Sequence, residues 1–447
     1  MLVLKKQKTY SNFILILIAF AVFGFFASFL SKSPIFSIAF SLFIFGFFLF
    51  QDLDKCFSIL LFFLPLQGIF DSSNFLYFIN ILGGLYFVKL IFIYKKFHPI
   101  FLLILFLYLY NFLLLIINFT DFSSIISATS FFVSISSLVL SALLKDKINF
   151  TAKRNFYLFF FGCLLSGLFS YINLFSEYGF SMSIRLVSLA RDANYFALYC
   201  LCGFFFANYF LGTDAYSSSK TYFRICKYLF LILGLLTTSK MFLMMLCLGL
   251  VISFFISKHR FTRKKIAIVM SLIVIGVIIA TSLGIFNFFI ERYIGRIDFS
   301  DITTGRSDIS LAFLSAQFSD VGRAIFGVGT NYSNVYNIVY NAEHMSCHLA
   351  YQEMLLSFGM FGSILFIWLI SWAISIFFNS TTIRLNASFL VLGIFLLCCF
   401  ALPLFTNDAF WLFFSFILGF MYENNNYVIK RAKIRGKIYA YKCKVIA

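Results

Sequence analysis

The stretch HMSCHLAYQEMLLSFGMFG, residues 344–362, gathers titratable side chains in a sequence that is 62% hydrophobic. His348, Tyr351 and Glu353 come directly before or at the start of an apolar run. A histidine in such a position can act as a general base near neutral pH and take the proton of an attacking hydroxyl. The same residues could instead be polar caps on the end of a helix.

A metal site is a second reading of this stretch. The spacing of His344 and His348 puts both imidazoles on one face of a helix, where Glu343 or Cys347 could complete a zinc site. The sequence contains no HExxH motif, and a third ligand is not obvious. We therefore predict no metal and no cofactor.

Arginines gather in two other polar segments, residues 176–194 and 287–353. The first contains Arg185 and Arg191, and the second contains Arg306 together with several acids. Arginine presents a planar fork of donors that suits phosphate oxygens. The alternative is that these arginines pair with nearby acids and keep the loops soluble.

The elements that must position these groups are membrane helices. With 69 Phe and only 12% charged residues, the chain is incompatible with a water-soluble surface. Apolar blocks of the length that a bilayer requires recur along it, and they do not alternate as barrel strands do. We predict an all-α polytopic protein of about 12 to 14 transmembrane helices, folded as one domain over residues 1–447. The predicted spans are 13–30, 34–50, 56–70, 75–94, 99–118, 125–144, 155–175, 193–212, 228–238, 241–257, 266–286, 354–378, 388–402 and 409–422.

The charges behind the net +18 are distributed unevenly between the two sides of the membrane in the predicted topology. With the N-terminus inside, most of the 35 Lys and Arg fall in cytoplasmic segments, which is the positive-inside pattern and not that of a nucleic-acid-binding protein. The termini are then cytoplasmic, and the basic tail 423–447 is expected to anchor to the inner leaflet. Segments 176–194 and 287–353 are expected outside, the latter as one large loop. Lys89 is the only clear charge inside a span.

Four shorter predictions concern the turn LTTSK, the cysteines, two glycines and the tyrosines near the long loop. Residues 227–258 are too short for two full spans, so we expect a hairpin of short or broken helices with LTTSK at its tip and Lys240 near the outer face. Among the ten cysteines only Cys347 is expected outside, so no disulfide framework is predicted. Gly359 and Gly362 are expected to allow close packing between helices. The tyrosines near the long loop are expected to contact glycan: Tyr332, Tyr336, Tyr340 and Tyr351.

Taken in order, the polar segments resemble the O-antigen polymerase and O-antigen ligase superfamily of bacterial envelope proteins. Its members carry an external R-x-x-G-x-x-x-[ND]-P-N segment, a T-G-S-R turn, then G-R-S, G-x-G and H-N-x-x-L-x-x-x-x-E-x-G-x-x-G. The corresponding text here is RLVSLARDAN, LTTSK, GRSD, FGVG and HLAYQEMLLSFGMFG, all within the C-terminal part of the chain. The first 150 residues match only in hydrophobicity. The chain departs from the motifs at several positions: Ser188 for glycine, Ala193 for proline, Lys240 for arginine, Leu349 for asparagine and Ser357 for the acid.

The resemblance implies a metal-independent glycosyl transfer on the periplasmic face of the inner membrane. The donor and the acceptor would be glycans linked to undecaprenyl diphosphate, and a chain-length regulator is a possible further partner besides the membrane lipids. His348 would be the base, with Arg306 and Glu353 as the other catalytic residues. The residues implied in substrate binding are Arg185, Arg191, Asn194, Lys240, Tyr351 and His344.

Two rival functions stay open from sequence. A ligase of the same superfamily would move the finished glycan onto lipid A core. A flippase of lipid-linked sugars would instead carry charges facing a cavity in many spans and an internal repeat, neither of which is visible. We favour the polymerase because the motifs have drifted and the N-terminal half carries no distinctive pattern.

Overall fold

The computed structural model describes twelve stretches of the chain, and every regular element in them is a helix. The described residues are 2–31, 34–69, 78–118, 122–148, 151–178, 186–190, 192–212, 219–256, 306–340, 347, 349–378 and 387–423. The predicted all-α class is therefore confirmed for these residues. The predicted span 266–286 and the tail beyond residue 423 lie outside them.

The helices follow the predicted spans closely. Those of the first part are α1 (Leu2–Ser31), α2 (Pro34–Leu49), α3 (Leu53–Phe63), η1 (Leu64–Leu66), α4 (Phe78–Tyr94), α5 (Ile100–Ile117), α6 (Phe122–Leu143), α7 (Ala152–Tyr178), α8 (Ala193–Leu211), α9 (Lys220–Leu236) and α10 (Lys240–Ile256). Those of the last part are α13 (Arg306–Phe318), α14 (Val321–Phe326), α15 (Tyr332–Tyr340), α16 (Ala350–Phe378), α17 (Ala387–Cys398) and a final helix over residues 408–423. The largest differences from the predicted starts are at α1, which begins at Leu2 instead of residue 13, and at α9, which begins at Lys220 instead of residue 228.

Apolar surface on these helices indicates a membrane protein. Five helices in the described part are long and apolar enough to cross a bilayer: α5, α6, most of α7, α8 and α16. On α5 the exposed side chains are all apolar, and five of them recur every three or four residues, namely Leu102, Leu105, Leu109, Leu113 and Ile116. A helix face of this kind is stable against lipid and unfavourable against water.

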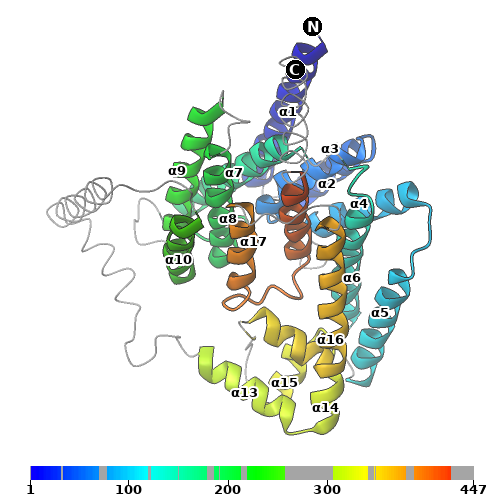
Figure 1. Cartoon of the computed structure of the whole chain (residues 1–447). Coiled ribbons are helices and arrows are strands. Elements are labelled where there is room, and N and C mark those ends of the chain that lie inside the picture. The colour runs from blue at the N-terminus through cyan, green and yellow to red at the C-terminus, as the bar shows by residue number, and fades with distance from the viewer. Residues whose placement is uncertain are drawn as a thin grey trace, which may run out of the picture.

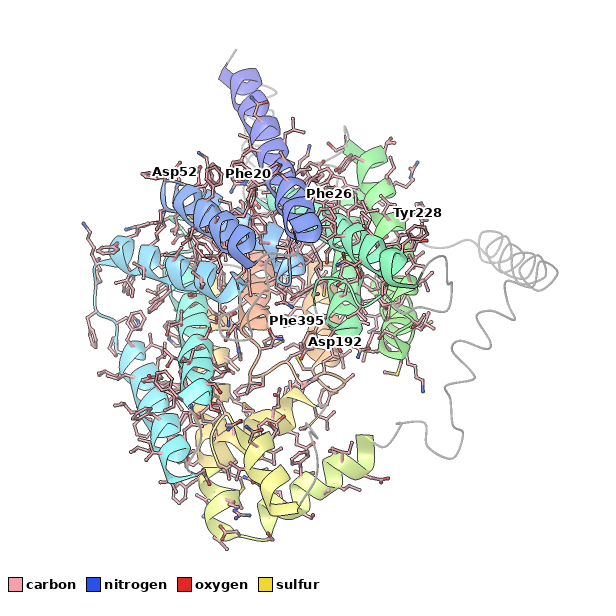
Figure 2. The ribbon with its side chains drawn as sticks, turned by 180° about the vertical axis from the view of Figure 1, so that it is seen from behind. Phe20, Phe26, Asp52, Asp192, Tyr228 and Phe395 are labelled. Carbon is pink, nitrogen blue, oxygen red and sulfur yellow. The ribbon has the colours of Figure 1, made fainter. Side chains whose placement is uncertain are left out.

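The predicted external loop 287–353 is largely helical where it is described. Helices α13, α14 and α15 pack on α16, and they gather at the end of the molecule opposite the start of α1 (Figure 1). Figure 2 labels Asp192, at the start of α8, toward this same end of the helices. The described part of the loop, residues 306–340, is thus a folded cap on the helix bundle.

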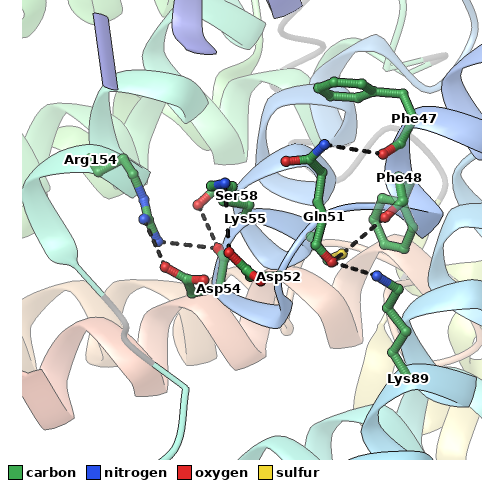
Figure 3. Close-up of polar contacts among 10 residues, drawn as sticks. Phe47, Phe48, Gln51, Asp52, Asp54, Lys55, Ser58, Lys89 and Arg154 are labelled. Carbon is green, nitrogen blue, oxygen red and sulfur yellow. Dashed lines mark hydrogen bonds and ion pairs between the residues drawn. The ribbon is translucent and has the colours of Figure 1, made fainter. Parts of the chain in front are cut away.

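The opposite end is held by a polar cluster around the turn between α2 and α3 (Figure 3). The Arg154 guanidinium donates to Asp54 through Oδ2 at 3.0 Å and through the backbone carbonyl at 3.1 Å. The Lys89 ammonium leaves α4 to donate to the Gln51 carbonyl at 2.5 Å. Lysine stems commonly lie along apolar surface while the charge reaches a helix end. Lys89, the only clear charge inside a predicted span, therefore has a structural role at the end of α2. This weakens the case for a flippase, which would need charges that face a cavity.

Candidate functional site

Residues 186–190, the described stretch between α7 and α8 apart from Asp192, form a mostly buried strap that is hydrogen-bonded to neighbouring helices. The Leu186 amide donates to the Leu236 carbonyl at the end of α9, at 3.2 Å. The Gly68 amide, just after η1, donates to the Leu189 carbonyl at 2.8 Å. Two predicted substrate-binding residues, Arg185 and Arg191, flank this strap and lie outside the described residues.

Ser188 in the strap has a left-handed backbone. Its φ is +62°, a region that costs a residue with a Cβ roughly 1–2 kcal/mol. Local hydrogen bonds hold it there, since the Ser188 amide donates to Ser170 Oγ at 3.1 Å and Ser188 Oγ accepts from the Ala190 amide at 3.0 Å. The bend is therefore built into the strap.

The predicted hairpin is present, and its tip meets the start of α8. Helix α9 ends at Leu236 and α10 begins at Lys240, so the turn is Thr237 to Ser239. Ser239 Oγ donates to Asn194 Oδ1 at 2.9 Å. Two of the predicted substrate-binding residues, Asn194 and Lys240, are thereby brought to one place, with Lys240 half-buried.

Glu353 is the best-defined member of the predicted site. Its side chain is 3% exposed and accepts hydrogen bonds from the Phe405 amide at 2.8 Å and Thr406 Oγ1 at 2.7 Å. A longer contact of 3.4 Å comes from the Tyr332 hydroxyl. The carboxylate thus connects α16 to α15 and to the loop of residues 399–407, which suits a positioning residue.

The loop of residues 399–407 also connects Glu353 with the start of α8. The Tyr195 hydroxyl donates to the Pro403 carbonyl at 2.9 Å, and the Ala350 amide donates to the Cys399 carbonyl at 2.9 Å. The starts of α8, α10 and α16 therefore lie around this loop and the LTTSK turn. Segments more than 150 positions apart in sequence meet there.

Of the remaining predicted residues, Tyr351 is described in full, Arg306 only by its backbone, and the two histidines not at all. Tyr351 is 38% exposed, and its hydroxyl donates to the Leu396 carbonyl at 3.0 Å. Arg306 begins α13, although its side chain is not among those described. Helix α13 is held to the start of α16 by Gln352, whose Nε2 donates to the Ser310 carbonyl at 2.7 Å. His344 and His348 lie outside the described residues.

One expectation about this region is wrong, the one for the tyrosines. The membrane side of Cys347 stays a prediction; the residue is fully buried, and burial raises the pKa of its thiol to about 12. Its Sγ lies 3.1 Å from Gln352 Oε1 as a neutral donor. Tyr332 and Tyr336 are 3% and 1% exposed in the same small core, so they cannot be surface contacts for a glycan. Among the described residues no group of three possible metal ligands occurs.

Gly359 interrupts α16, and the FGVG segment packs against the backbone there. Its φ is +60° and its ψ is −172°, so the nine residues before it form a separate short helix. The Val328 amide donates to the Leu356 carbonyl at 3.1 Å, and the Gly329 amide to the Ser357 carbonyl at 2.8 Å. The expected close packing at Gly359 is confirmed, but the partner is this loop and not a membrane helix. Gly362 does pack between helices, because its Cβ would lie 3.2 Å from the Tyr110 ring of α5.

The sequence analysis missed Asn111, a fully buried residue in the middle of α5. Its Oδ1 accepts from the Thr330 amide at 2.9 Å, and its Nδ2 donates to Thr330 Oγ1 at 3.2 Å. The Asn111 side chain thus satisfies both the amide and the hydroxyl of Thr330, the residue that follows the FGVG segment. The signal was an asparagine inside an apolar span, where polar residues are costly and need partners.

Replacing Asn111 with leucine should destabilise the cap. The change conserves volume but leaves the buried Thr330 amide without an acceptor, which costs about 1–3 kcal/mol. Thermal unfolding of the purified protein in detergent would measure the loss. Leu113→Ala is the matched control on the same helix, because Leu113 is 58% exposed and should matter little. Equal melting temperatures for the two variants would contradict the proposed role of Asn111.

No protein-family model and no curated protein matches this chain. The resemblance described above therefore depends on the order of the motifs in the sequence. The geometry adds that the described parts of four of these motifs, RLVSLARDAN, LTTSK, FGVG and HLAYQEMLLSFGMFG, are connected by hydrogen bonds, directly or through the loop of residues 399–407.

Proposed function

We propose that the chain is an O-antigen polymerase, a glycosyltransferase that joins repeat units carried on undecaprenyl diphosphate. The observation that carries the proposal is the meeting of the motif segments. The strap is bonded to the end of α9, the LTTSK turn is bonded to Asn194, and the loop of residues 399–407 joins α8 to Glu353. An enzyme site assembled from distant loops needs this arrangement.

The backbone gives independent support to the resemblance. Ser188 and Thr238 stand where the R-x-x-G and T-G-S-R motifs carry glycine, and their φ angles are +62° and +50°. Gly327 and Gly329 of the G-x-G motif have φ of +76° and +92°. Glycine is the residue that adopts such angles without strain. The conformation therefore fits the motif even where this chain has substituted another residue.

In the proposed reaction, an acceptor sugar hydroxyl attacks the anomeric carbon of the donor glycan. The new glycosidic bond forms as the bond from that carbon to the diphosphate breaks, and the diphosphate leaves with the electron pair. His348 takes the proton of the hydroxyl. The cations Arg185, Arg191, Lys240 and Arg306 stabilise the departing negative charge, which is electrostatic catalysis and requires no metal in this proposal. Glu353 positions the loop of residues 399–407 beside these cations.

The proposed location is the inner membrane, with the site on the periplasmic side. Support comes from the basic N-terminal residues and from the position of α13 to α15 at the opposite end of the molecule (Figure 1). Membrane lipids would surround the apolar faces, and a chain-length regulator would be a partner of the polymerase.

A deletion strain separates the three functions. Surface polysaccharide reduced to a single repeat on each core is the result expected for a polymerase. Polymer that accumulates on undecaprenyl diphosphate would instead identify the ligase. Lipid-linked repeats that stay on the cytoplasmic side would identify a flippase and overturn the proposal.

His348→Ala and Arg306→Ala should each abolish complementation of that strain. Loss of a general base lowers a rate by at least on the order of 10²-fold, so long polymer should disappear from surface polysaccharide gels. The matched controls are His98→Ala and Arg323→Ala, which change the same residue types away from the site. Full-length polymer from the first two variants, at normal membrane levels, would show that the site is misassigned.

A further inference from the structure

The last residues of α14 present apolar side chains outside the core of the cap. Ile325 and Phe326 are 36% and 49% exposed. The Phe326 carbonyl accepts a hydrogen bond from the Tyr110 hydroxyl of α5. Tyr110 also lies against the exposed Phe361 of α16, with the ring centroids 6.0 Å apart. The end of α14 therefore adjoins the apolar surfaces of two helices that are long enough to cross a membrane.

Helix α5 gives the depth of this contact in the membrane. It begins shortly after the exposed Lys95 and Lys96, which mark a boundary of the bilayer. The 18 residues from Ile100 to Ile117 rise about 27 Å, close to the roughly 30 Å of a hydrocarbon core. Tyr110 comes about two helical turns before Ile117, so it lies about 10 Å inside the end of this span.

The two turns of α5 that follow Tyr110 need lipid around them. Leu113, Ile116 and Ile117 are 58%, 50% and 67% exposed, which is unfavourable in water. The FGVG segment packs along these same turns, because Asn118 Nδ2 at their end donates to the Val328 carbonyl at 3.1 Å. The segment thus lies at the depth of the last part of the span.

Helix α16 leads to the same depth. The ring of His98, which lies between the two lysines and α5, is 5.2 Å from the ring of Trp372, and tryptophan is typical of a membrane boundary. The chain from Trp372 back to Phe361 rises only about 17 Å, so roughly 10 Å of hydrocarbon core remains on the side of the cap. The Ile325 carbonyl is packed against Gly359, two residues from Phe361, and therefore lies in this remaining layer.

The charged start of α14 lies further out than its apolar end. Asp320 Oδ1 accepts from the Arg323 amide at 2.8 Å and caps the helix. The turn that joins α13 to α14 lies at the outer edge of the cap (Figure 1). Asp320 precedes Phe326 by about 9 Å of helix, which brings the carboxylate to the level of the lipid headgroups.

We propose that Ile325 and Phe326 insert among the acyl chains of the membrane leaflet on the side of the cap. The occupant of this apolar surface is phospholipid, because the surface adjoins the lipid-facing sides of α5 and α16 at a depth that those helices assign to hydrocarbon. The cap is then partly immersed in the bilayer. The proposal depends on the membrane character of the helices and not on glycan transfer, so it can fail or hold independently of the polymerase.

The test uses tryptophan fluorescence of the full chain in nanodiscs. Phe326→Trp is made together with Trp368→Phe and Trp372→Phe, so that the buried Trp411 is the only native tryptophan left. Emission is compared between ordinary phospholipid and phospholipid with brominated acyl chains, which quenches a tryptophan that touches it. We expect the loss of emission to match that of Trp368, which is 55% exposed on α16, in a chain that carries only Trp372→Phe.

Three further variants decide the result. Ile325→Trp is a second probe if Phe326→Trp lowers the melting temperature. The chain with Trp411 alone gives the unquenched baseline, and Asn334→Trp, at an exposed polar position of α15, should emit as in water and be quenched little. Equal quenching of Asn334→Trp would overturn the depth assigned to α14.

The wavelength of emission separates the remaining outcomes. Emission of both probes at the wavelength typical of water, without quenching, means that the cap stands outside the bilayer. Emission at short wavelength without quenching means that a protein covers the surface, and the mass of the complex then shows whether that protein is a second copy. Either result overturns the proposal.

Discussion

Gly359→Ala should prevent the chain from reaching its native fold. The new Cβ would lie 2.3 Å from the Ile325 carbonyl oxygen and 2.5 Å from the Gly327 nitrogen. Both are backbone atoms, so no side chain can move aside. The φ of +60° adds strain of its own. Together these effects should cost more than about 4 kcal/mol, and the yield of folded protein in membranes should fall sharply.

Gly393→Ala is the control for this change. Gly393 lies in α17, and no atom comes within 4 Å of the position of a Cβ there. Alanine is the better helix former by roughly 0.5–1 kcal/mol, so this variant should be neutral or slightly stabilised. Comparable melting temperatures for the two alanine variants would show that α16 does not need its break.

Glu353→Ala should be almost as damaging. It leaves the buried Phe405 amide and the half-buried Thr406 hydroxyl without their acceptor, and each unsatisfied buried group costs about 1–3 kcal/mol. The loop of residues 399–407 would separate from α16, so glycan transfer should fall together with thermal stability. Both quantities can be measured on the same purified preparation.

Two variants test the positioning role of Glu353. Glu353→Gln keeps an acceptor oxygen and should retain much of both stability and transfer. Asp52→Ala removes a carboxylate that is 80% exposed and should change stability by less than about 1 kcal/mol. If Glu353→Gln melts like the native chain but transfers no glycan, the carboxylate acts in the chemistry and the positioning role is wrong.

The helices could be predicted because hydropathy along the chain is a local property. Charge parity predicted a turn at LTTSK, and α9 and α10 do meet there; that both helices cross the membrane stays a prediction. The partners of Glu353 could not be found that way, because Phe405 and Thr406 lie about 50 positions further along the chain. No spacing rule connects residues that only tertiary packing brings together.

Burial within the cap could not be predicted from the sequence either. Tyr332 and Tyr336 read as exposed because they lie in a polar loop, yet Phe313 and Cys347 enclose them in a core of their own. A short helix carries too few turns for its apolar face to be recognised. His348, Arg185 and Arg191 lie outside the described residues, so their roles as base and as phosphate-binding residues stay predictions.

The hydrogen bonds from α5 to the FGVG segment bear on how such proteins could be recombined. Asn111 and Asn118 belong to the half of the chain that carries no motif, yet they hold Thr330 and Val328 in the other half. A chimera that exchanged N-terminal halves to change glycan preference would break these contacts unless both asparagines travelled with the C-terminal part. The structural unit that holds the FGVG segment therefore includes α5.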